Sequence, residues 1–342
     1  MKITTENEKL LVDQILINLG VKKEDAELVT EVVLNADLKG FSSHGIGRFP
    51  QYIKTIDANN IKLKGEIEIE RETESIAVIN GHSLFGQIVA TKAMKLAIEK
   101  AKKTGVGIVG THNSNHFGVT GFYSDLAAKE DCIGITFANT EPAIAPLNGK
   151  KPIIGTNPIA ISIPNDDTYI ATDMATSASA RGKLLEAQRK GQSIPPNTAL
   201  DKEGNPTTDP TEALDGSILA FGAHKGYALA FMIEILCGPL VGADVGTNVT
   251  GTADWRENCT KGDLFIAINP DKFVGIDAFK AGTNEFIKQI RDADNGFVPG
   301  DIEVKRVAEK RENGIEIDSK LYEQLKEICD GLDINIEKYM EK

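Results

Sequence analysis

The sequence predicts an α/β fold with an added helical part, and three observations lead to this fold class. The first forty residues contain two amphipathic helical runs, each followed by a glycine. From residue 75 onward, short runs rich in β-branched residues alternate with helical runs, which is typical of an α/β protein. The tail, residues 304–342, is rich in charge and repeats apolar residues at helical spacing.

The two N-terminal helices are predicted from their ends as well as from their apolar stripes. Thr5 and Glu8 have the spacing of a capping box, and Gly20 stands where the first helix would end. The second helix would end at Gly40. The stripes consist of Leu11, Ile15 and Leu19 in the first helix and of Leu28, Val32, Val33 and Ala36 in the second.

The middle of the chain is predicted to alternate strands and helices. The expected strands are residues 75–79, 106–109, 133–137, 159–163, 169–172 and 264–268, and the expected helices are residues 87–103 and 123–129. Residues 194–215 contain several prolines and few apolar residues, so we interpret them as a surface excursion. It would be either a solvated loop or a lid or partner-contacting arm. Residues 226–240 are almost wholly apolar apart from Glu234, which predicts a buried helix.

Composition and charge exclude several classes of protein. The chain has 342 residues, of which 38 are Lys or Arg and 50 are Asp or Glu, so its formal net charge is −12. This acidic balance, with no basic cluster, argues against binding to nucleic acid or to an anionic membrane surface. The longest uncharged run, residues 104–124, includes two histidines and two asparagines and is no membrane span. The first residues include acids and no apolar signal segment, so we expect the protein in the cytoplasm.

The cysteines give a consistent indication. Cys132, Cys237, Cys259 and Cys329 lie far apart and form no C-x-x-C pair. Neither a zinc ribbon nor a disulfide framework is therefore indicated. We expect four reduced, mostly buried thiols.

The run from Gly105 to Gly110 matches the letters of the dinucleotide fingerprint G-x-G-x-x-G but not its setting. In that fingerprint the glycines follow a strand and open a helix. Here a predicted helix precedes the glycines and a predicted strand runs through them. A dinucleotide, if one binds, must therefore be held in a non-Rossmann site.

His44, Arg48 and Tyr52 form the first group of candidate site residues. They follow one another at i, i+4 and i+8, so on a helix capped by Ser42 or Ser43 they would share one face. That face would offer an acid, a guanidinium clamp for a carboxylate, and a hydroxyl donor. The alternative interpretation is a helix-capping histidine beside a surface arginine.

His116 lies in the polar run 111–118, directly after a predicted buried strand. Open α/β sheets bind ligands at the carboxyl ends of their strands, and an imidazole works near neutral pH without a large pKa shift. The alternative is that this run only satisfies loop backbone groups. His112 stands four residues before His116, but no carboxylate or cysteine accompanies them at zinc-ligand spacing, so we predict no metal site.

Three further turns, residues 155–158, 173–177 and 224–227, carry small and polar residues beside apolar segments. Such turns present backbone amides and hydroxyls to phosphate groups. Lys225 stands at the start of the predicted helix 226–240, where a cation and a helix N-terminus together favour an anion. The turns together indicate a cofactor site of non-Rossmann type.

Five motifs then follow one another in a specific order. They are Ser43-His44-Gly45 with Arg48 and Tyr52, Asn115-His116-Phe117-Gly118, Gly155-Thr156-Asn157-Pro158, Asp173-Met174-Ala175-Thr176, and His224-Lys225-Gly226-Tyr227. In this order they resemble the second malate/L-lactate dehydrogenase family over nearly the whole chain. Stretches within residues 37–53 and 259–270 are most similar to the archaeal L-sulfolactate/malate members. The resemblance implies a mixed-sheet α/β sandwich with a helical subdomain, a homodimer, and NAD bound without a Rossmann fold, with NADP as the alternative.

The resemblance also implies roles for individual residues. His44 and His116 match histidines proposed as proton donor or acceptor, and Arg48 matches a position that binds the substrate carboxylate. Tyr52 and Asn115 are expected to bind substrate as well. Between the two histidines we favour His116 as the acid/base and His44 as its substrate-orienting partner, and the reverse assignment stays open.

The same resemblance places the cofactor. The residues expected to hold it are Thr140, Asp173, Met174, Ala175, Thr176, His224, Lys225, Gly300 and Asp301. No catalytic metal is expected. Ala223 and Ala228 stand where many relatives have glycine, so the cofactor would fit more tightly or shift near Lys225.

The expected function is therefore an NAD(P)-dependent dehydrogenase of a small L-2-hydroxy acid, either sulfolactate or malate. Sulfolactate would imply a place in coenzyme M biosynthesis. A ureidoglycolate dehydrogenase or cyclic ketimine reductase of the same family is the alternative, and a non-catalytic ligand-binding protein is the alternative of another class. We expect a helical part in residues 1–72, an α/β part with the cofactor and substrate in 73–225, and a mixed part in 226–342 that packs on the N-terminal helices.

Overall fold

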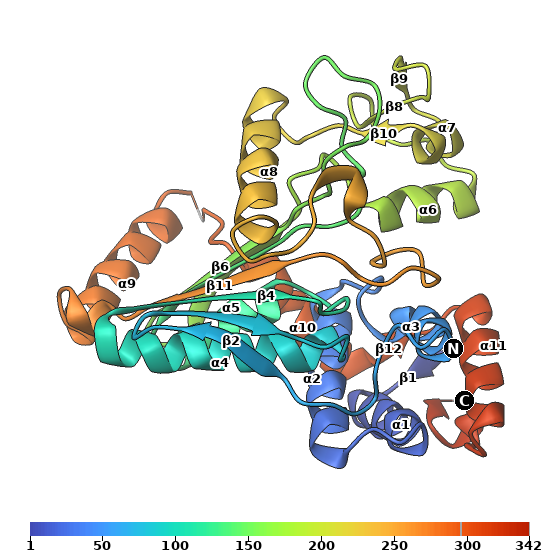
Figure 1. The fold of residues 1–342 in the computed structure, drawn as a ribbon, viewed down its shortest axis with the longest axis horizontal. Coiled ribbons are helices and arrows are strands. Elements are labelled where there is room, and N and C mark those ends of the chain that lie inside the picture. Colours follow the sequence, from blue (N-terminus) through green and yellow to red (C-terminus); the bar gives the residue numbers. More distant parts are fainter. Residues whose placement is uncertain (295, 342) are drawn as a thin grey trace.

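The computed structural model describes residues 1–294 and 296–341 and is built around one mixed β-sheet (Figure 1). The sheet has seven strands in the order β2-β3-β4-β11-β5-β6-β7. β3 and β4 pair in parallel, and the other neighbouring pairs are antiparallel. The strands are β2 (Glu68–Glu72), β3 (Ile76–Asn80), β4 (Val106–His112), β5 (Ile133–Ala138), β6 (Ile159–Pro164), β7 (Tyr169–Met174) and β11 (Asp263–Ile268). The expected mixed-sheet α/β fold is confirmed.

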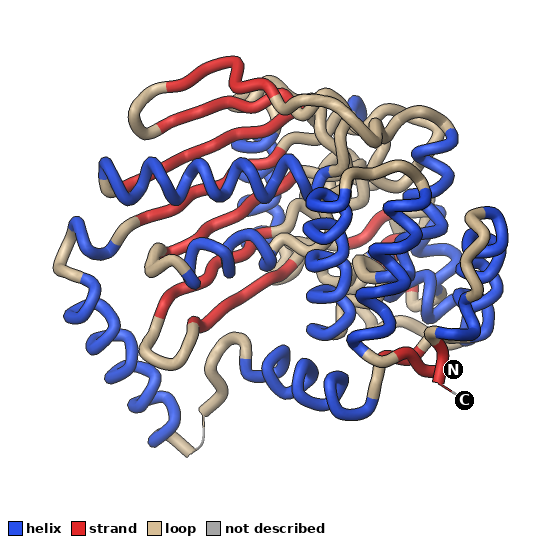
Figure 2. Tube along the Cα trace, turned by 90° about the horizontal axis from the view of Figure 1, so that it is seen from below, coloured by secondary structure: helices blue, strands red, loops and turns tan. Residues whose placement is uncertain are grey.

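Helices cover both faces of the sheet. They are α4 (Gly86–Thr104), α5 (Gly121–Lys129) and α8 (His224–Cys237). Val109 and Phe265 pack in one apolar cluster with α4 and α5, whereas Ile108 and Leu264 pack with α8. Because neighbouring residues of a strand point to opposite faces, α4 and α5 lie on one face and α8 lies on the other. Figure 2 shows α4 running alongside the strands.

A helical part at one end of the sheet contains both chain ends (Figure 1). Its elements are β1 (Lys2–Ile3), α1 (Thr5–Asn18), α2 (Lys23–Lys39), η1 (Ile46–Arg48), α3 (Phe49–Asp57), α10 (Asp301–Asn313), β12 (Ile315–Glu316), α11 (Ser319–Gly331), η4 (Ile336–Lys338) and β13 (Met340–Glu341). β1 pairs with both β12 and β13, so the tail of the chain is joined to its beginning. α2 ends at Gly40, whose φ of +88° allows the left-handed turn that the sequence predicts there.

The expected cap of α1 is shifted by one residue. The side chain of Thr4, and not that of Thr5, accepts a hydrogen bond from the Asn7 backbone nitrogen. Glu8 therefore takes no part in a capping box and is fully buried. The prediction was wrong because two adjacent threonines offer the same side chain to the helix start.

Residues 194–215 are folded, which corrects their interpretation as an excursion. They belong to a small lobe made of α6 (Arg181–Lys190), β8 (Ala199–Leu200), β9 (Pro206–Thr207), α7 (Pro210–Asp215) and β10 (Ser217–Ile218). Its core consists of Ala143, Leu184, Ile194, Ala199, Ala213 and Ile218. The residues of this core come from segments that are far apart in the sequence, so they form no periodic pattern. Residues 194–215 therefore showed no sign of a buried face.

The predicted helix 226–240 forms α8, which ends at Cys237 and is buried on one side only. Phe231, Met232 and Ile235 keep 46%, 60% and 45% of their surface exposed. The helix is apolar all round, but the rest of this chain covers only one side of it and leaves the other side exposed. Among the described residues, no helix combines the length and apolarity that a membrane span requires.

The sheet does not respect the expected boundaries at 72/73 and 225/226. β2 comes from before the first boundary, and β11 from after the second lies in the middle of the sheet. The division into three parts therefore stays a prediction.

The rejection of a Rossmann fingerprint is confirmed, because α4 precedes Gly105 and β4 runs through the later glycines. A Cβ on Gly107 would lie 1.9 Å from the Ala97 carbonyl oxygen, so packing explains this glycine.

The outer elements complete the chain. They are η2 (Gly246–Asn248), η3 (Pro270–Lys272) and α9 (Ile276–Asp292). The four cysteines are free and buried, as expected.

Candidate active site

The polar residues predicted to form the site gather at one end of the sheet. β4, β5 and β7 run in one direction, opposite to β6 and β11. The carboxyl ends of β4, β5 and β7 and the amino ends of β6 and β11 therefore lie at the same end of the sheet. His116 follows β4, Thr140 follows β5, Asp173 lies at the end of β7, Asn157 precedes β6 and Lys261 precedes β11.

His116 is held through its Nδ1 atom. Tyr52 Oη lies 2.8 Å and the Gly118 backbone nitrogen 3.3 Å from His116 Nδ1. Gln87 Nε2 donates to Tyr52 Oη over 2.8 Å, so the tyrosine turns its own proton toward the imidazole. Because both neighbours donate to Nδ1, this network assigns the proton of the neutral ring to Nε2. Within the described chain Nε2 has no hydrogen-bond partner and is the nitrogen left for a ligand.

His44 lies beside His116, with the ring centroids 5.3 Å apart, and its Nδ1 is 2.9 Å from Ser43 Oγ. Removal from water, and then the charge of Arg48, lower the pKa of His44 to about 4. Removal from water also lowers the pKa of His116 well below its usual range, and Arg48, His44 and Lys261 add to this. Both imidazoles are therefore neutral near pH 7, and the expectation of an unshifted His116 was wrong.

Arg48 is hydrogen-bonded to the segment that carries Thr252. Arg48 Nη2 donates to the Thr252 carbonyl, and Gln51 Nε2 donates to the same carbonyl over 3.2 Å and to that of Ala253 over 2.9 Å. Glu141 accepts a hydrogen bond from the Ala253 nitrogen over 2.9 Å. Arg48 Nε is buried and has no partner among the described residues. The guanidinium thus keeps unused donors, as a carboxylate-binding arginine requires.

The single helix expected to carry His44, Arg48 and Tyr52 does not form. His44 lies in a turn, Arg48 ends η1 and Tyr52 lies on α3. Ser43 bonds the neighbouring imidazole and caps no helix. The three side chains still converge, because Tyr52 binds His116 and the charge of Arg48 reaches both histidines.

Asn115 has a structural task. Its Nδ2 donates to three backbone carbonyls, those of Asn60, Ser83 and Leu84, over 3.1, 2.9 and 3.1 Å. The amide nitrogen therefore ties together the loops below His116. Its expected contact with substrate stays a prediction.

His112 does not join His116. Its Nε2 lies 2.9 Å from Oε2 of Glu70, a residue of the edge strand β2. In the parts of the chain that the structure describes, no group of three or more His, Cys, Asp or Glu side chains is arranged to hold a metal ion.

The residues expected at the cofactor include a group of threonines. Thr176 donates to the Thr156 carbonyl through its backbone nitrogen and its hydroxyl, each over 2.9 Å. The Thr156 nitrogen donates to Thr140 Oγ1 over 3.0 Å. Beside them Met174 is exposed and Ala175 is half-buried. The structure thus brings the ends of β5 and β7 together.

The start of α8 adjoins these threonines, because the Phe221 nitrogen donates to the Thr176 carbonyl over 3.0 Å. His224 and Lys225 are exposed in the first turn of α8, which has no side-chain cap. Ala223, just before them, has φ 53° and ψ −116°. Glycine adopts this conformation without penalty, whereas alanine is strained, so the departure from glycine leaves strain beside Lys225.

Asp173 and the turn at Gly300 form the outer part of the expected cofactor site. Asp173 accepts a hydrogen bond from the Gly121 nitrogen over 2.7 Å, and burial raises the pKa of Asp173 to about 6. Gly300, with φ +98°, lies against β7. Asp301 is bound by the guanidinium of Arg291 and starts α10.

Sequence reasoning missed Lys261, Asp263 and Gln87. Lys261 Nζ lies 2.5 and 2.7 Å from the two carboxylate oxygens of Asp263, and both side chains are buried. The same Nζ lies 4.3 Å from the centroid of Phe117, the residue after His116. Opposite charges two residues apart in an apolar strand share a face, and this signal was available. A single glutamine in an amphipathic helix gives no such signal.

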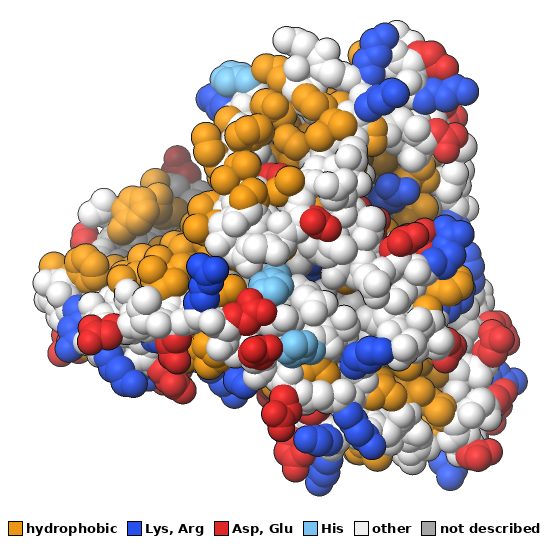
Figure 3. Space-filling view, in the orientation of Figure 1, with side chains coloured by type: hydrophobic (Ala, Val, Ile, Leu, Met, Phe, Trp, Pro, Cys, Tyr) orange, Lys and Arg blue, Asp and Glu red, His pale blue; other side chains and the backbone are white. Residues whose placement is uncertain are grey.

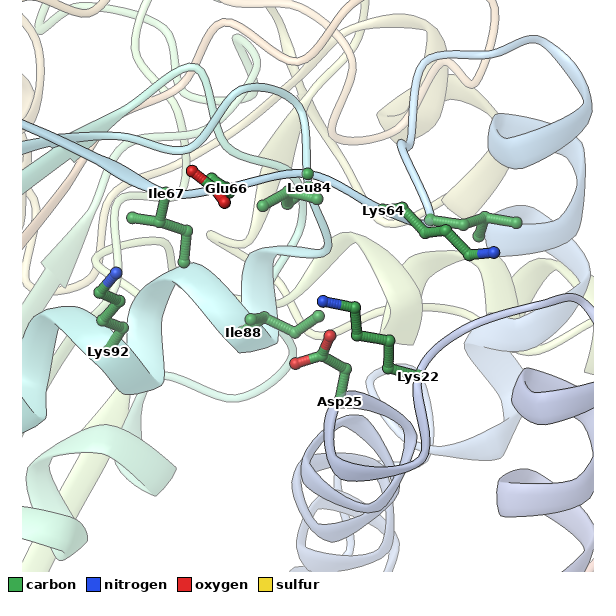
Figure 4. Close-up of a pocket in the computed structure, with 10 residues that line it drawn as sticks. Lys22, Asp25, Lys64, Glu66, Ile67, Leu84, Ile88 and Lys92 are labelled. Atoms are coloured by element: carbon green, nitrogen blue, oxygen red, sulfur yellow. The ribbon is translucent and has the colours of Figure 1, made fainter.

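A pocket of about 370 Å³ lies elsewhere, between α2, α4 and residues 63–67 (Figure 4). Its lining includes Lys22, Asp25, Lys64, Glu66, Ile67, Leu84, Ile88 and Lys92. None of the predicted site residues is among them, and its exposed charges are of both signs. A second pocket, of about 190 Å³, lies between residues 142–143 and the small lobe.

Comparison with known proteins identifies the family of the chain. A family model described as malate/L-lactate dehydrogenase matches residues 3–326. The malate/(S)-sulfolactate dehydrogenase of Methanothermus fervidus is 59% identical over 337 residues, which cover 98% of this chain and 99% of that protein. The L-sulfolactate dehydrogenase of Methanothermobacter thermautotrophicus is 59% identical over 337 residues, with the same coverage. The solved sulfolactate dehydrogenase of Methanocaldococcus jannaschii has a TM-score of 0.95 at 51% identity and covers 100% of both chains.

These matches confirm the resemblance inferred from the five motifs and the expected enzyme class, an oxidoreductase that acts on a hydroxy acid. The mixed sheet, the paired histidines and the arginine are thus found in a chain whose whole length matches such enzymes. The chain belongs to the malate/L-lactate dehydrogenase family.

Proposed function

We propose that this chain interconverts a small L-2-hydroxy acid and its 2-oxo acid with NAD or NADP, and that the hydroxy acid is sulfolactate or malate. The observation that carries the proposal is the convergence of an oriented, neutral His116 with an arginine that has unused donors. The names of the similar archaeal proteins support this pair of substrates. A place in coenzyme M biosynthesis depends on the sulfolactate alternative and stays a prediction.

The donor set near α8 suits a nicotinamide dinucleotide. Lys225 and His224 are exposed at an uncapped helix start, where backbone amides and a cation favour phosphate. The threonines at the ends of β5 and β7, together with Asp173, offer the hydroxyl and carboxylate groups that bind ribose and amide groups. When bound, the nicotinamide would accept or supply the hydride.

His116 is the proposed acid/base, and Arg48 the proposed carboxylate clamp. Oxidation of the hydroxy acid requires that His116 Nε2 accept the hydroxyl proton, and reduction requires that it return this proton to the alkoxide. Arg48 would bind the substrate carboxylate through its unused donors and so orient C2 beside the imidazole. His44, 5.3 Å from His116 between ring centroids, would orient the substrate.

The direct test follows the absorbance of the reduced nicotinamide with oxaloacetate, sulfopyruvate, pyruvate and 2-oxoglutarate. We expect oxidation with oxaloacetate or sulfopyruvate, and weaker or no activity with the other two. A cyclic ketimine and ureidoglycolate serve as probes of the alternative within the family. No turnover with any of these compounds, together with thermal stabilisation by one of them, would favour a non-catalytic binding protein.

The chain also has a surface suited to a second copy of itself. We define the apolar patch by its exposed residues, Phe231, Met232, Ile235 and Leu240 on and after α8, Phe273, Val274 and Phe286 in and before α9, and Phe297. Figure 3 shows hydrophobic side chains gathered over α8. Exposed apolar surfaces of this kind mark protein interfaces. Because His224 and Lys225 lie in the first turn of α8, a homodimer formed here would close over the proposed cofactor site.

A charge in the apolar patch is expected to dissociate the dimer. Met232→Glu places a carboxylate where a partner would bury an apolar side chain, so sedimentation equilibrium should show a monomer with reduced activity. Leu10→Glu, on exposed α1 outside the patch, is the matched control and should leave the dimer intact. A wild-type chain that sediments as a fully active monomer would contradict the proposal.

The expected location is the cytoplasm. The four buried thiols suit this reducing compartment.

A further inference from the structure

The hydrogen bonds around His116 pose a problem for its proposed role. In the arrangement described above, Gln87 donates to Tyr52 and Tyr52 donates to His116 Nδ1. The proton of the neutral ring is then on Nε2, the nitrogen that the proposed mechanism assigns to the substrate. A nitrogen that already carries a proton has no lone pair for the hydroxyl proton of a substrate. The arrangement is therefore unable to start oxidation.

A second arrangement of the same three side chains removes the problem. If the Gln87 amide turns over, its Oε1 accepts the Tyr52 proton, and Tyr52 Oη accepts a proton from His116 Nδ1. Nε2 is then bare and accepts the substrate proton. When Nε2 is protonated as well, Nδ1 keeps its proton and its bond to Tyr52, so this arrangement serves both directions of the reaction.

The surroundings of Gln87 allow both arrangements. Its side chain is fully buried, and Oε1 has no hydrogen-bond partner in the described chain. Turning the amide satisfies Oε1 at Tyr52 and places the NH₂ group where Oε1 was. Each orientation thus leaves one half of the amide without its bond to Tyr52, so neither is strongly favoured. The Gly118 nitrogen, 3.3 Å from Nδ1, adds a small preference for the first arrangement.

Tyr52 is suited to transmit the change. It is buried, and burial raises the pKa of its hydroxyl to about 12, so the hydroxyl keeps its proton and is able both to donate and to accept. The charged or titratable groups that face His116 are Arg48 from η1, His44 from the turn before it and Lys261 from the start of β11. None of these three lies on the hydrogen-bond chain through Nδ1.

We propose that Gln87 is a positioning residue that sets the tautomer of His116 through Tyr52. Rotation of its amide shifts the equilibrium of the neutral ring from the Nε2–H form to the Nδ1–H form that catalyses the reaction, and the ring then releases the Nε2 proton to solvent and takes up one proton on Nδ1. This inference rests on the proposed role of His116 as the acid/base. Gln87 itself touches neither substrate nor cofactor. The hydrogen-bonded series Gln87–Tyr52–His116 therefore has two states, and rotation of the Gln87 amide decides whether Nε2 of the imidazole carries a proton.

Two substitutions of Gln87 are expected to act in opposite directions. Gln87→Glu offers acceptors only, which holds the Nδ1–H form, so turnover should be kept and the ionisation of His116 should rise by about one to two pH units. Gln87→Met, of similar size, neither donates nor accepts strongly, so the Gly118 nitrogen, which donates to Nδ1, decides the arrangement and Tyr52 turns its proton to Nδ1. Turnover should then fall about tenfold to a hundredfold in both directions with little change in KM.

A spectroscopic measurement separates the tautomer from the activity. The ¹⁵N shifts of the His116 ring, assigned with a His116→Gln variant, distinguish Nε2–H from Nδ1–H. We expect Nε2–H to dominate in the Gln87→Met protein and Nδ1–H in the Gln87→Glu protein. Equal spectra in the two variants would overturn the proposal whether or not the protein proves to be a dehydrogenase. Loss of activity with all substrates but a tautomer change as expected would overturn the proposed function alone.

A double-mutant cycle tests whether Gln87 acts through Tyr52. Tyr52→Phe removes the hydroxyl that connects Gln87 to His116. In this background, adding Gln87→Met should change turnover by less than about twofold. Additive losses would show that Gln87 supports the fold of α4 instead. Thr91→Val is the matched control, because Thr91 lies one turn further on α4 and also has a buried, unpartnered side-chain oxygen. It should leave the pH profile and the ring spectrum of His116 unchanged.

Discussion

Replacing His116 by alanine is expected to lower turnover by about two to four orders of magnitude in both directions, the usual contribution of a positioned acid/base. The variant keeps Arg48 and the threonines near α8, so substrate and cofactor should still bind. The measurement is the steady-state rate with saturating cofactor, in each direction. His112→Ala is the control, since His112 pairs with Glu70 away from the site and its loss should leave turnover near normal.

The pH dependence of this reaction follows from the lowered pKa of His116. Burial, and then Arg48, His44 and Lys261, disfavour the imidazolium, so the free enzyme holds neutral His116 well into the acid range. Oxidation needs the neutral ring, so kcat/KM for the hydroxy acid should stay level on lowering the pH until it reaches the depressed pKa. Reduction needs the imidazolium, so kcat/KM for the oxo acid should fall as pH rises above that value.

Substrate binding should move this ionisation upward. An anionic acid on Arg48 offsets the second largest cause of the shift, so kcat for reduction should hold to a higher pH than kcat/KM. His116→Ala should abolish the ionisation, whereas His44→Ala should mainly raise KM and keep it. The opposite pattern would assign the proton transfer to His44. Near-normal turnover in both variants would remove the two histidines from the mechanism altogether.

Much of the fold was predictable because it depends on local patterns. α1, α2 and α4 have apolar stripes and glycine ends, and the inner strands are runs of β-branched residues. The small lobe was missed because its strands have two residues each and its core unites segments that are far apart in the sequence. The exposure of α8 was missed because an apolar helix looks the same whether this chain or a second copy covers it.

The candidate site was predictable in its residues but not in its connections. His44, Arg48, Tyr52 and His116 do converge, although not through the single helix that their spacing suggested. Their pKa values depend on burial and on Arg48, which no spacing reveals. Gln87 reaches Tyr52 from another helix, so only the folded chain identifies it.

Replacing Arg48 by lysine is expected to raise KM for the oxo acid by about a hundredfold or more while lowering kcat less, although the charge is retained. A guanidinium presents parallel donors that bind both oxygens of a carboxylate, whereas an ammonium is a point charge on a flexible stem. Arg48 also bonds the Thr252 carbonyl, so its loss would loosen the segment above the site. The measurement is the change in KM and kcat with oxaloacetate and sulfopyruvate.

Gln51→Ala separates these two effects of Arg48. Gln51 donates to the same Thr252 carbonyl and to that of Ala253, but it carries no charge for a carboxylate. If Arg48 binds substrate, Gln51→Ala should raise KM by no more than a few fold, about the value of one neutral hydrogen bond at a half-exposed site. A rise in KM as large as that of Arg48→Lys would instead mean that both residues act by holding the Thr252 segment in place. The carboxylate would then have to be bound elsewhere, and Lys261 is unsuited to this because Asp263 already neutralises its buried charge.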